Sequence, residues 1–182
     1  KESIQESRLL TVELYPPILH EAGLIGGLEW LVRWMQDKHG FHVKLDAQGD
    51  VNIKREDICI LLFQSIRELL FNSVKHSGVS KAQLIVRRKG DFVQLTIRDE
   101  GMGFDPQKLH ERTEKMNGGF GLFSIRERLT SLGGQLEIVS APNAGATFVL
   151  KAPADIALNF VSKTQPSKRK IQDVCVLPAR QA

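Results

Sequence analysis

Four polar side chains occur at helical spacing inside an otherwise apolar stretch, "RELLFNSVKHSG" (67–78). Glu68, Asn72 and His76 are four residues apart and would share one face of a helix. An amide oxygen is a neutral hard ligand that suits Mg²⁺, and a carboxylate one turn earlier can hold a metal-bound water or accept a proton. Lys75 and His76, in the last turn, can reach phosphate oxygens. A polar face that only meets water has the same spacing, so this stretch alone leaves both interpretations open.

A second polar segment, "IRDEGMGFD" (97–105), ends an apolar strand with Asp99. A carboxylate only accepts hydrogen bonds, so Asp99 would match the exocyclic amino group of adenine and repel the carbonyl of guanine. Gly101 and Gly103 follow, and glycine allows positive φ angles and the close approach of a flat ring. A glycine-rich turn without a ligand would have the same composition, because GxG by itself is a weak signal.

A glycine cluster, "NGGFGLFSIRERL", precedes a further predicted helix. Free amide hydrogens and the positive end of the helix dipole form a phosphate site at such a position, and Gly119 and Gly121 would let the chain bend over the phosphates. A flexible loop that caps the helix is the alternative, and the GxxxxGK[ST] pattern of Walker-type loops is absent. In "NAGATFVL", Thr147 could assist Asp99 around the adenine, although threonine is also a normal strand residue.

The elements that must position these residues follow from the hydrophobic pattern. Pro16 and Pro17 end a first helix, and Gly40 ends a second. Predicted helices cover 2–14, 23–39, 56–76 and 121–132, and predicted strands lie at 41–46 and in two hairpins, 82–101 and 135–153. The polar stretch 105–118 is predicted to be a mobile loop.

Long helices combined with two hairpins and one strand predict an α+β protein, a two-layer α/β sandwich with a mixed or antiparallel sheet. The elements do not alternate as βαβ units, which weighs against a Rossmann fold. The predicted elements divide the chain into a helical segment and linker at 1–22, a domain at 23–153 and a linker or tail at 154–182.

The 182 residues suffice for one ordinary domain, and the net charge of +4 is mild. Lysine and arginine are scattered rather than gathered in a stripe with aromatics, so no nucleic acid partner is expected. No apolar run predicts contact with a membrane. Cys59 and Cys175 are isolated, which favours a reduced, cytoplasmic setting. The chain begins at Lys1, and we expect a piece of a longer protein whose other parts could include a membrane anchor.

Taken in order, these segments resemble the motifs of the Bergerat-fold ATPases, which include gyrase, the heat-shock chaperone, the MutL repair proteins and histidine kinases. "ELLFNSVKHS" is similar to the N box, "DEGMGF" to the G1 box, "GFGLFSIRERL" to the G2 box and "GATFVL" to the final threonine motif. The resemblance spans roughly residues 56–150. It implies Mg²⁺ and ATP as cofactors, Asn72 as metal ligand, Asp99 as adenine reader and residues 104–119 as a lid with glycine hinges. Nucleotide contacts are also implied at Phe104 and Leu122.

Within that superfamily, the chain most resembles sensor histidine kinases related to the nitrate/nitrite sensors. "RLLTVELYPPILHEAGLIGGLEWLV" is similar to the end of their dimerisation hairpin. The resemblance implies transfer of the ATP γ-phosphoryl to a histidine, with Glu68 ordering the metal's water shell. No segment here resembles the "ELHD" phosphoacceptor site, so we expect that histidine on a helix absent from this sequence. The implied partners are the dimerisation and phosphoacceptor helices and the receiver domain of a response regulator.

Three other functions share the fold. An ATP-driven clamp would use Glu68 to activate water, but nothing after Pro153 resembles the further domain of such proteins. A serine kinase that inhibits a sigma factor would lack the N-terminal helical segment. A nucleotide-binding regulatory scaffold without catalysis is the third, and the presence of all four motifs argues against it.

Overall fold

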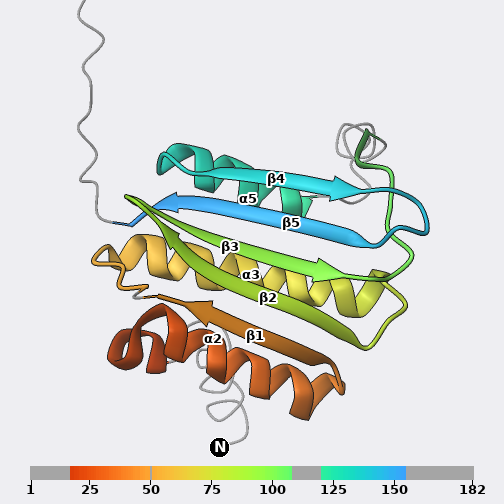
Figure 1. Ribbon diagram of the computed structural model, residues 1–182, viewed down its shortest axis with the longest axis horizontal. Coiled ribbons are helices and arrows are strands. Elements are labelled where there is room, and N and C mark those ends of the chain that lie inside the picture. Colours follow the sequence, from red (N-terminus) through yellow and green to blue (C-terminus); the bar gives the residue numbers. More distant parts are fainter. Residues whose placement is uncertain (1–16, 50, 108–119, 155–182) are drawn as a thin grey trace, which may run out of the picture.

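The computed structural model describes residues 17–49, 51–107 and 120–154, which form two layers (Figure 1). One layer is a five-stranded sheet with strand order β1-β2-β3-β5-β4. The first pair, β1 and β2, is parallel, and the other neighbouring pairs are antiparallel. The strands are β1 (His42–Gln48), β2 (Lys81–Lys89), β3 (Phe92–Asp99), β4 (Gln135–Ser140) and β5 (Ala146–Pro153). The predicted mixed sheet and two-layer α/β sandwich are confirmed.

Three helices cover one face of this sheet: α2 (Ile18–His39), α3 (Glu56–His76) and α5 (Phe120–Ser131). Strand alternation directs Val93, Leu95 and Ile97 of β3 toward the helices, and all three are fully buried. From the other side of that core, α3 contributes Leu62, Ile66, Leu69 and Leu70, which are equally buried. Helix α3 therefore lies at the centre of the domain. Its packing determines the direction in which its polar side chains point.

Helix α2 begins at Ile18 rather than at the predicted residue 23, and its backbone leaves helical geometry at Gly23 (φ 64°). The extra turn packs against the domain, because the side chain of Leu19 is buried in the core. Gly27 provides the space: a β-carbon there would lie 2.7 Å from the Leu19 side chain. The proposed domain boundary after residue 22 falls at the Gly23 kink. The predicted helix at 2–14 lies outside the described residues.

Helices α2 and α3 run side by side in the same direction. His20 Nδ1 lies 3.4 Å from the Glu56 carboxylate near their first turns, and Trp34 meets the Phe71 ring edge-on near their last turns. His39 also contacts Phe71 edge-on, with 5.1 Å between ring centroids. Such aromatic contacts add to the burial energy, so the end of α3 that carries the polar residues is held firmly against α2.

Two further expectations concern the described part of the chain. None of its helices is long and apolar enough to cross a membrane. Cys59 is buried and unpaired, and burial raises the pKa of its thiol above the usual value. A protonated, enclosed thiol is a poor nucleophile. Cys175 lies outside the described residues.

The burial of Leu19 leads to a test of where the folded unit begins. Leu19→Ala should lower the free energy of unfolding by about 2–4 kcal/mol, because it empties a packed core position. His20→Ala, at the exposed neighbour, should change it by less than about 0.5 kcal/mol. Urea denaturation of both variants measures the difference. Equal, small effects would show that the turn before Gly23 is part of a linker rather than of the domain.

Candidate functional site

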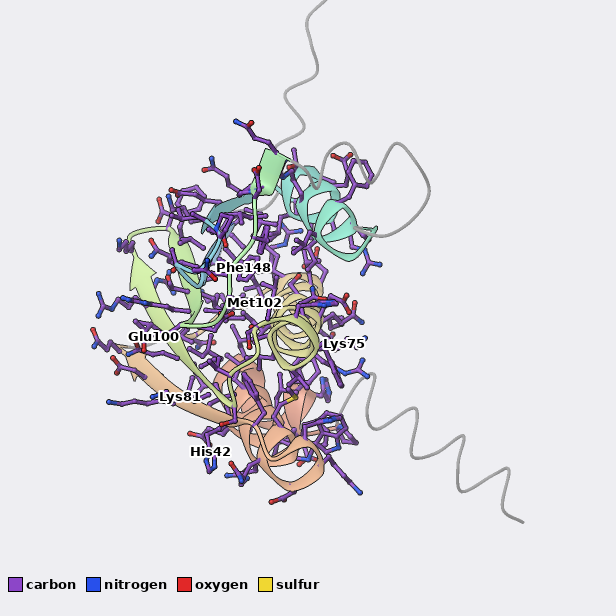
Figure 2. All side chains as sticks on the ribbon, turned by 90° about the vertical axis from the view of Figure 1, so that its right-hand side faces the viewer. His42, Lys75, Lys81, Glu100, Met102 and Phe148 are labelled. Carbon is purple, nitrogen blue, oxygen red and sulfur yellow. The ribbon has the colours of Figure 1, made fainter. Side chains whose placement is uncertain are left out.

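The predicted site residues gather at one end of the domain, where α3 ends, β3 ends and β5 begins. Figure 2 looks onto this end: Glu100 and Met102 lie on the sheet side of α3, and Lys75 lies on its opposite side. The loop after β3 is fastened to the end of α3, because the amide of Met102 donates to the Ser77 carbonyl at 2.8 Å. Two segments that are far apart in sequence are thereby joined.

Asp99 is a buried carboxylate at the last position of β3, with 5% of its surface exposed. Strand alternation places it on the same face as Ile97, toward α3. Ser73 Oγ donates a hydrogen bond to Oδ2 at 2.8 Å, and the amide of Gly101 donates to Oδ1 at 3.1 Å. Each carboxylate oxygen keeps a lone pair, so Asp99 is oriented as an acceptor for a further donor.

The two glycines after Asp99 are required by close backbone contacts. A β-carbon at Gly101 would collide with the carbonyl of Ser77. Gly103 has φ 58°, as predicted for this motif, and a β-carbon there would collide with the carbonyl of Ala141. The loop is therefore pressed between α3 and the β4–β5 hairpin. A direct contact of either glycine with a ligand stays a prediction.

Phe104 attaches the following residues to the β4–β5 hairpin. Its ring stacks on Phe148 with 6.2 Å between centroids, and its amide donates to Ser140 Oγ at 2.9 Å. Ser140 Oγ in turn donates to the carbonyl of Gly145 at 2.8 Å. Phe104 thus anchors the loop after β3 to the β4–β5 hairpin, and its nucleotide contact stays a prediction. Of the predicted lid, residues 108–119, including Gly119, lie outside the described part.

The side chains proposed for the metal lie on the open face of α3. Glu68 is exposed and Asn72 is half-buried, one turn apart. Gly121, in the first turn of α5, lies against Glu68, because a β-carbon there would be 2.5 Å from Oε1. Arg128 Nη1 donates to Gln64 Oε1 at 3.2 Å and fixes the other end of α5 along α3. The start of α5 is therefore beside the Glu68–Asn72 face.

This oxygen set fits Mg²⁺, which keeps several waters and takes few protein ligands. Among the described residues, no three histidine, cysteine, aspartate or glutamate side chains form a group that would suggest a different, protein-caged metal. Leu122, also predicted to contact the nucleotide, is half-buried and packs against the core. Its position one residue after Gly121 keeps the start of α5 close to α3.

Lys75 and His76 are exposed in the last turn of α3. The ammonium of Lys75 lies 5.9 Å from the centroid of the Phe71 ring, on the side of α2. Arg67 lies over the same ring at 5.5 Å. In the structure Lys75 therefore makes a cation–π contact with Phe71, and its reach toward a phosphate remains a prediction.

The predicted role of Thr147 beside Asp99 is wrong. Strand β5 pairs with β3 so that Thr147 is opposite Arg98, and Ala146 is opposite Asp99. Because side chains alternate between the two faces of a strand, Thr147 lies on the outer face of the sheet, away from α3. A shift of one residue along a strand moves a side chain to the opposite face of the sheet. The sequence motif does not say which of the two neighbouring residues faces α3.

Sequence reasoning missed Ser73, which supplies the hydroxyl that Thr147 was expected to supply. Ser73 follows Leu62, Ile66 and Leu69 at helical spacing and is only 3% exposed. A serine at a position where the pattern calls for an apolar residue was the available signal. Buried polar groups are normally hydrogen-bonded, so its presence already indicated a polar partner in the core.

Comparison with known proteins gives a direct match. Residues 59–156 match the model of the family described as histidine kinase-, DNA gyrase B- and HSP90-like ATPase. A signal transduction histidine-protein kinase/phosphatase, DegS of Brevibacillus brevis, is 32% identical over 153 residues, which cover 84% of this chain and 38% of that protein. The sensor protein VraS of Staphylococcus haemolyticus is 32% identical over 155 residues, which cover 84% of this chain and 42% of that protein.

Solved structures show the same fold. The Erythrobacter litoralis blue-light activated histidine kinase aligns with a TM-score of 0.61 at 17% identity, covering 84% of this chain and 50% of that chain. The mycobacterial sensor histidine kinase MprB aligns with a TM-score of 0.55 at 17% identity, covering 71% of this chain and 93% of that chain. The predicted Bergerat-type fold is confirmed.

This chain spans less than half the length of the curated relatives DegS and VraS. The family match nevertheless covers more than half of the chain and includes α3 from Cys59 onward, the loop after β3, α5 and the β4–β5 hairpin. These are the elements that assemble the site. The chain therefore belongs to the histidine kinase-, DNA gyrase B- and HSP90-like ATPase family, as an ATP-binding domain of the kind found in sensor histidine kinases.

Proposed function

We propose that this domain is the ATP-donating part of a sensor histidine kinase and transfers the γ-phosphoryl of ATP to a histidine on a helix outside this sequence. One observation carries the proposal. The buried acceptor Asp99, at the end of β3, accepts a hydrogen bond from Ser73, and Ser73 directly follows Asn72 on α3. The proposed base-reading carboxylate therefore contacts the same turn of α3 that carries the proposed metal-binding amide. A nucleotide with its metal requires both groups at short range.

Asp99 would select adenine. Its free lone pairs can accept a hydrogen bond from the exocyclic amino group of adenine, whereas the carbonyl of guanine offers only another acceptor. The carboxylate is buried and already oriented by two donors, so it does not have to be ordered when the base binds. Preorganised polar groups of this kind discriminate more strongly than exposed ones.

Asn72 and Glu68 would hold Mg²⁺, Asn72 through its amide oxygen and Glu68 through metal-bound water. The ion would neutralise charge on the phosphates when bound. The start of α5 faces the same side, and amide hydrogens at a helix N-terminus favour phosphate groups. Phosphoryl transfer depends mainly on positioning and charge stabilisation, which these residues are arranged to supply.

In the reaction, an imidazole nitrogen of the acceptor forms a bond to the γ-phosphorus while the bond to the β–γ bridging oxygen breaks, and ADP leaves. The acceptor histidine would come from the dimerisation and phosphoacceptor helices of the whole protein. A receiver domain of a response regulator would then take the phosphoryl group. Since the donor is ATP, we place the domain in the cytoplasm, whether or not the whole protein is anchored to a membrane.

The base-reading role is tested with Asp99→Asn. Titration calorimetry in magnesium should show that the parent chain binds ATP in clear preference to GTP. Asp99→Asn should weaken ATP binding roughly 10- to 100-fold, the value of a hydrogen bond to a charged group. Thr147→Ala is the matched control and should leave ATP affinity unchanged, because Thr147 lies on the other face of the sheet. Equal affinities of ATP for the parent chain and Asp99→Asn would contradict this role.

The metal-binding role is tested with Asn72→Ala. The parent chain should bind ATP more tightly in magnesium than in a chelator, and Asn72→Ala should remove most of that difference because the amide ligand is lost. Lys54→Ala, an exposed change distant from the site in sequence, should preserve it. Magnesium enhancement of equal size in Asn72→Ala would place the metal elsewhere.

The catalytic role is tested by phosphotransfer. The chain mixed with a separately produced histidine-bearing helical hairpin and labelled ATP should label the hairpin. Asn72→Ala should lower the rate by at least about 10²-fold if metal positioning carries the reaction. Tight ATP binding with no transfer to any such hairpin would instead favour the regulatory scaffold without catalysis.

A further inference from the structure

We infer that Ser73 is a positioning residue for Asp99 and thereby sets the preference of this domain for adenine. The inference rests on the proposed function, in which Asp99 reads the base. Ser73 Oγ donates to Asp99 Oδ2 at 2.8 Å across the interface between α3 and β3. Both residues are almost completely enclosed, with 3% of Ser73 and 5% of Asp99 exposed.

The second donor does not suffice to orient the carboxylate. The amide of Gly101 donates to Oδ1 at 3.1 Å from the neighbouring loop. The terminal torsion of an aspartate has a broad, nearly two-fold energy profile, so one donor leaves the carboxylate plane poorly determined. Two donors, one on each oxygen, fix that plane and therefore the direction of the remaining lone pairs. Ser73 completes this arrangement.

No other hydroxyl in the described part of the chain has this position. Thr147 lies on the outer face of the sheet, and Ala146, which is paired with Asp99, has no polar atom. Ser77 is also buried at this end of α3, but its hydroxyl bonds with the backbone of Val79. The hydroxyl that orients the base-reading carboxylate thus comes from the helix that carries the metal site, not from the strand beside it.

Placement on α3 predicts which property Ser73 controls. Its side chain points to Asp99, while Asn72 lies on the open face of the same helix. Removal of the hydroxyl would disturb base recognition and leave the amide ligand of the metal in place. Loss of adenine preference without loss of the magnesium effect is therefore the signature of this role, and a general loss of stability would not produce it.

The test compares Ser73→Ala with Ser65→Ala by calorimetry with MgATP and MgGTP. Ser65 is equally buried in α3, but its hydroxyl donates to the Leu61 carbonyl at 2.7 Å and not to the site. Ser73→Ala should weaken ATP binding about tenfold while GTP binding stays the same, so the ATP/GTP ratio falls about tenfold. The magnesium effect should persist. Ser65→Ala should keep the parent ratio.

Each outcome is decisive. An unchanged ATP/GTP ratio in Ser73→Ala, with the ratio lost in Asp99→Asn, would overturn this inference and leave the proposed function intact. A parent chain without any preference for ATP would overturn the proposed function itself. If Ser73→Ala does not fold, as judged by thermal unfolding, Ser73→Cys replaces it. A thiol is a weaker donor, so a reduced ratio supports the inference and an unchanged ratio overturns it.

Discussion

A buried carboxylate is the constraint on which the site depends. Asp99 is enclosed by the core, and a charge in that position is costly unless donors surround it. One donor comes from α3 and the other from the loop after β3. The hydrogen bonds of the Asp99 carboxylate therefore also align α3 with the end of β3. The same alignment determines where Asn72 and Glu68 face. The proposed base recognition and metal binding would therefore both depend on this one set of hydrogen bonds.

Close backbone packing is the second source of order at this end of the domain. Gly101 lies against the end of α3, Gly103 against the β4–β5 hairpin, and Gly121 against Glu68. At Gly101 and Gly103 a β-carbon would collide with backbone atoms, so these two glycines permit contacts that larger residues would prevent. At Gly121 a β-carbon would meet the flexible end of the Glu68 side chain. These glycines let the segments that must enclose a nucleotide lie close together. Flexibility of the loop is a separate property that these contacts do not require.

Much of the fold could be predicted from the sequence because it depends on local periodicity. The apolar repeat of residues 56–76 predicted α3 with its observed bounds, and alternation with Gly90 predicted the β2–β3 hairpin. The start of α2 could not be predicted in the same way. Leu19 belongs to the domain only because Gly27, further along α2, leaves space for its side chain. Such a fit depends on contacts between turns, which periodicity does not describe.

Residue types and their order along the chain determined the family, the layered α/β architecture and the identities of Asp99, Asn72 and Glu68 as candidates for chemistry. Tertiary structure alone decided which hydroxyl meets Asp99. Thr147 was the natural candidate from the motif, yet the pairing of β3 with β5 turns it to the outer face and leaves Ala146 opposite the carboxylate. Ser73, a serine within an apolar pattern, takes that place from α3. The physical reason is that strand register and helix rotation are set by packing between elements, and a shift of one residue in either exchanges a buried partner for a solvent-facing one.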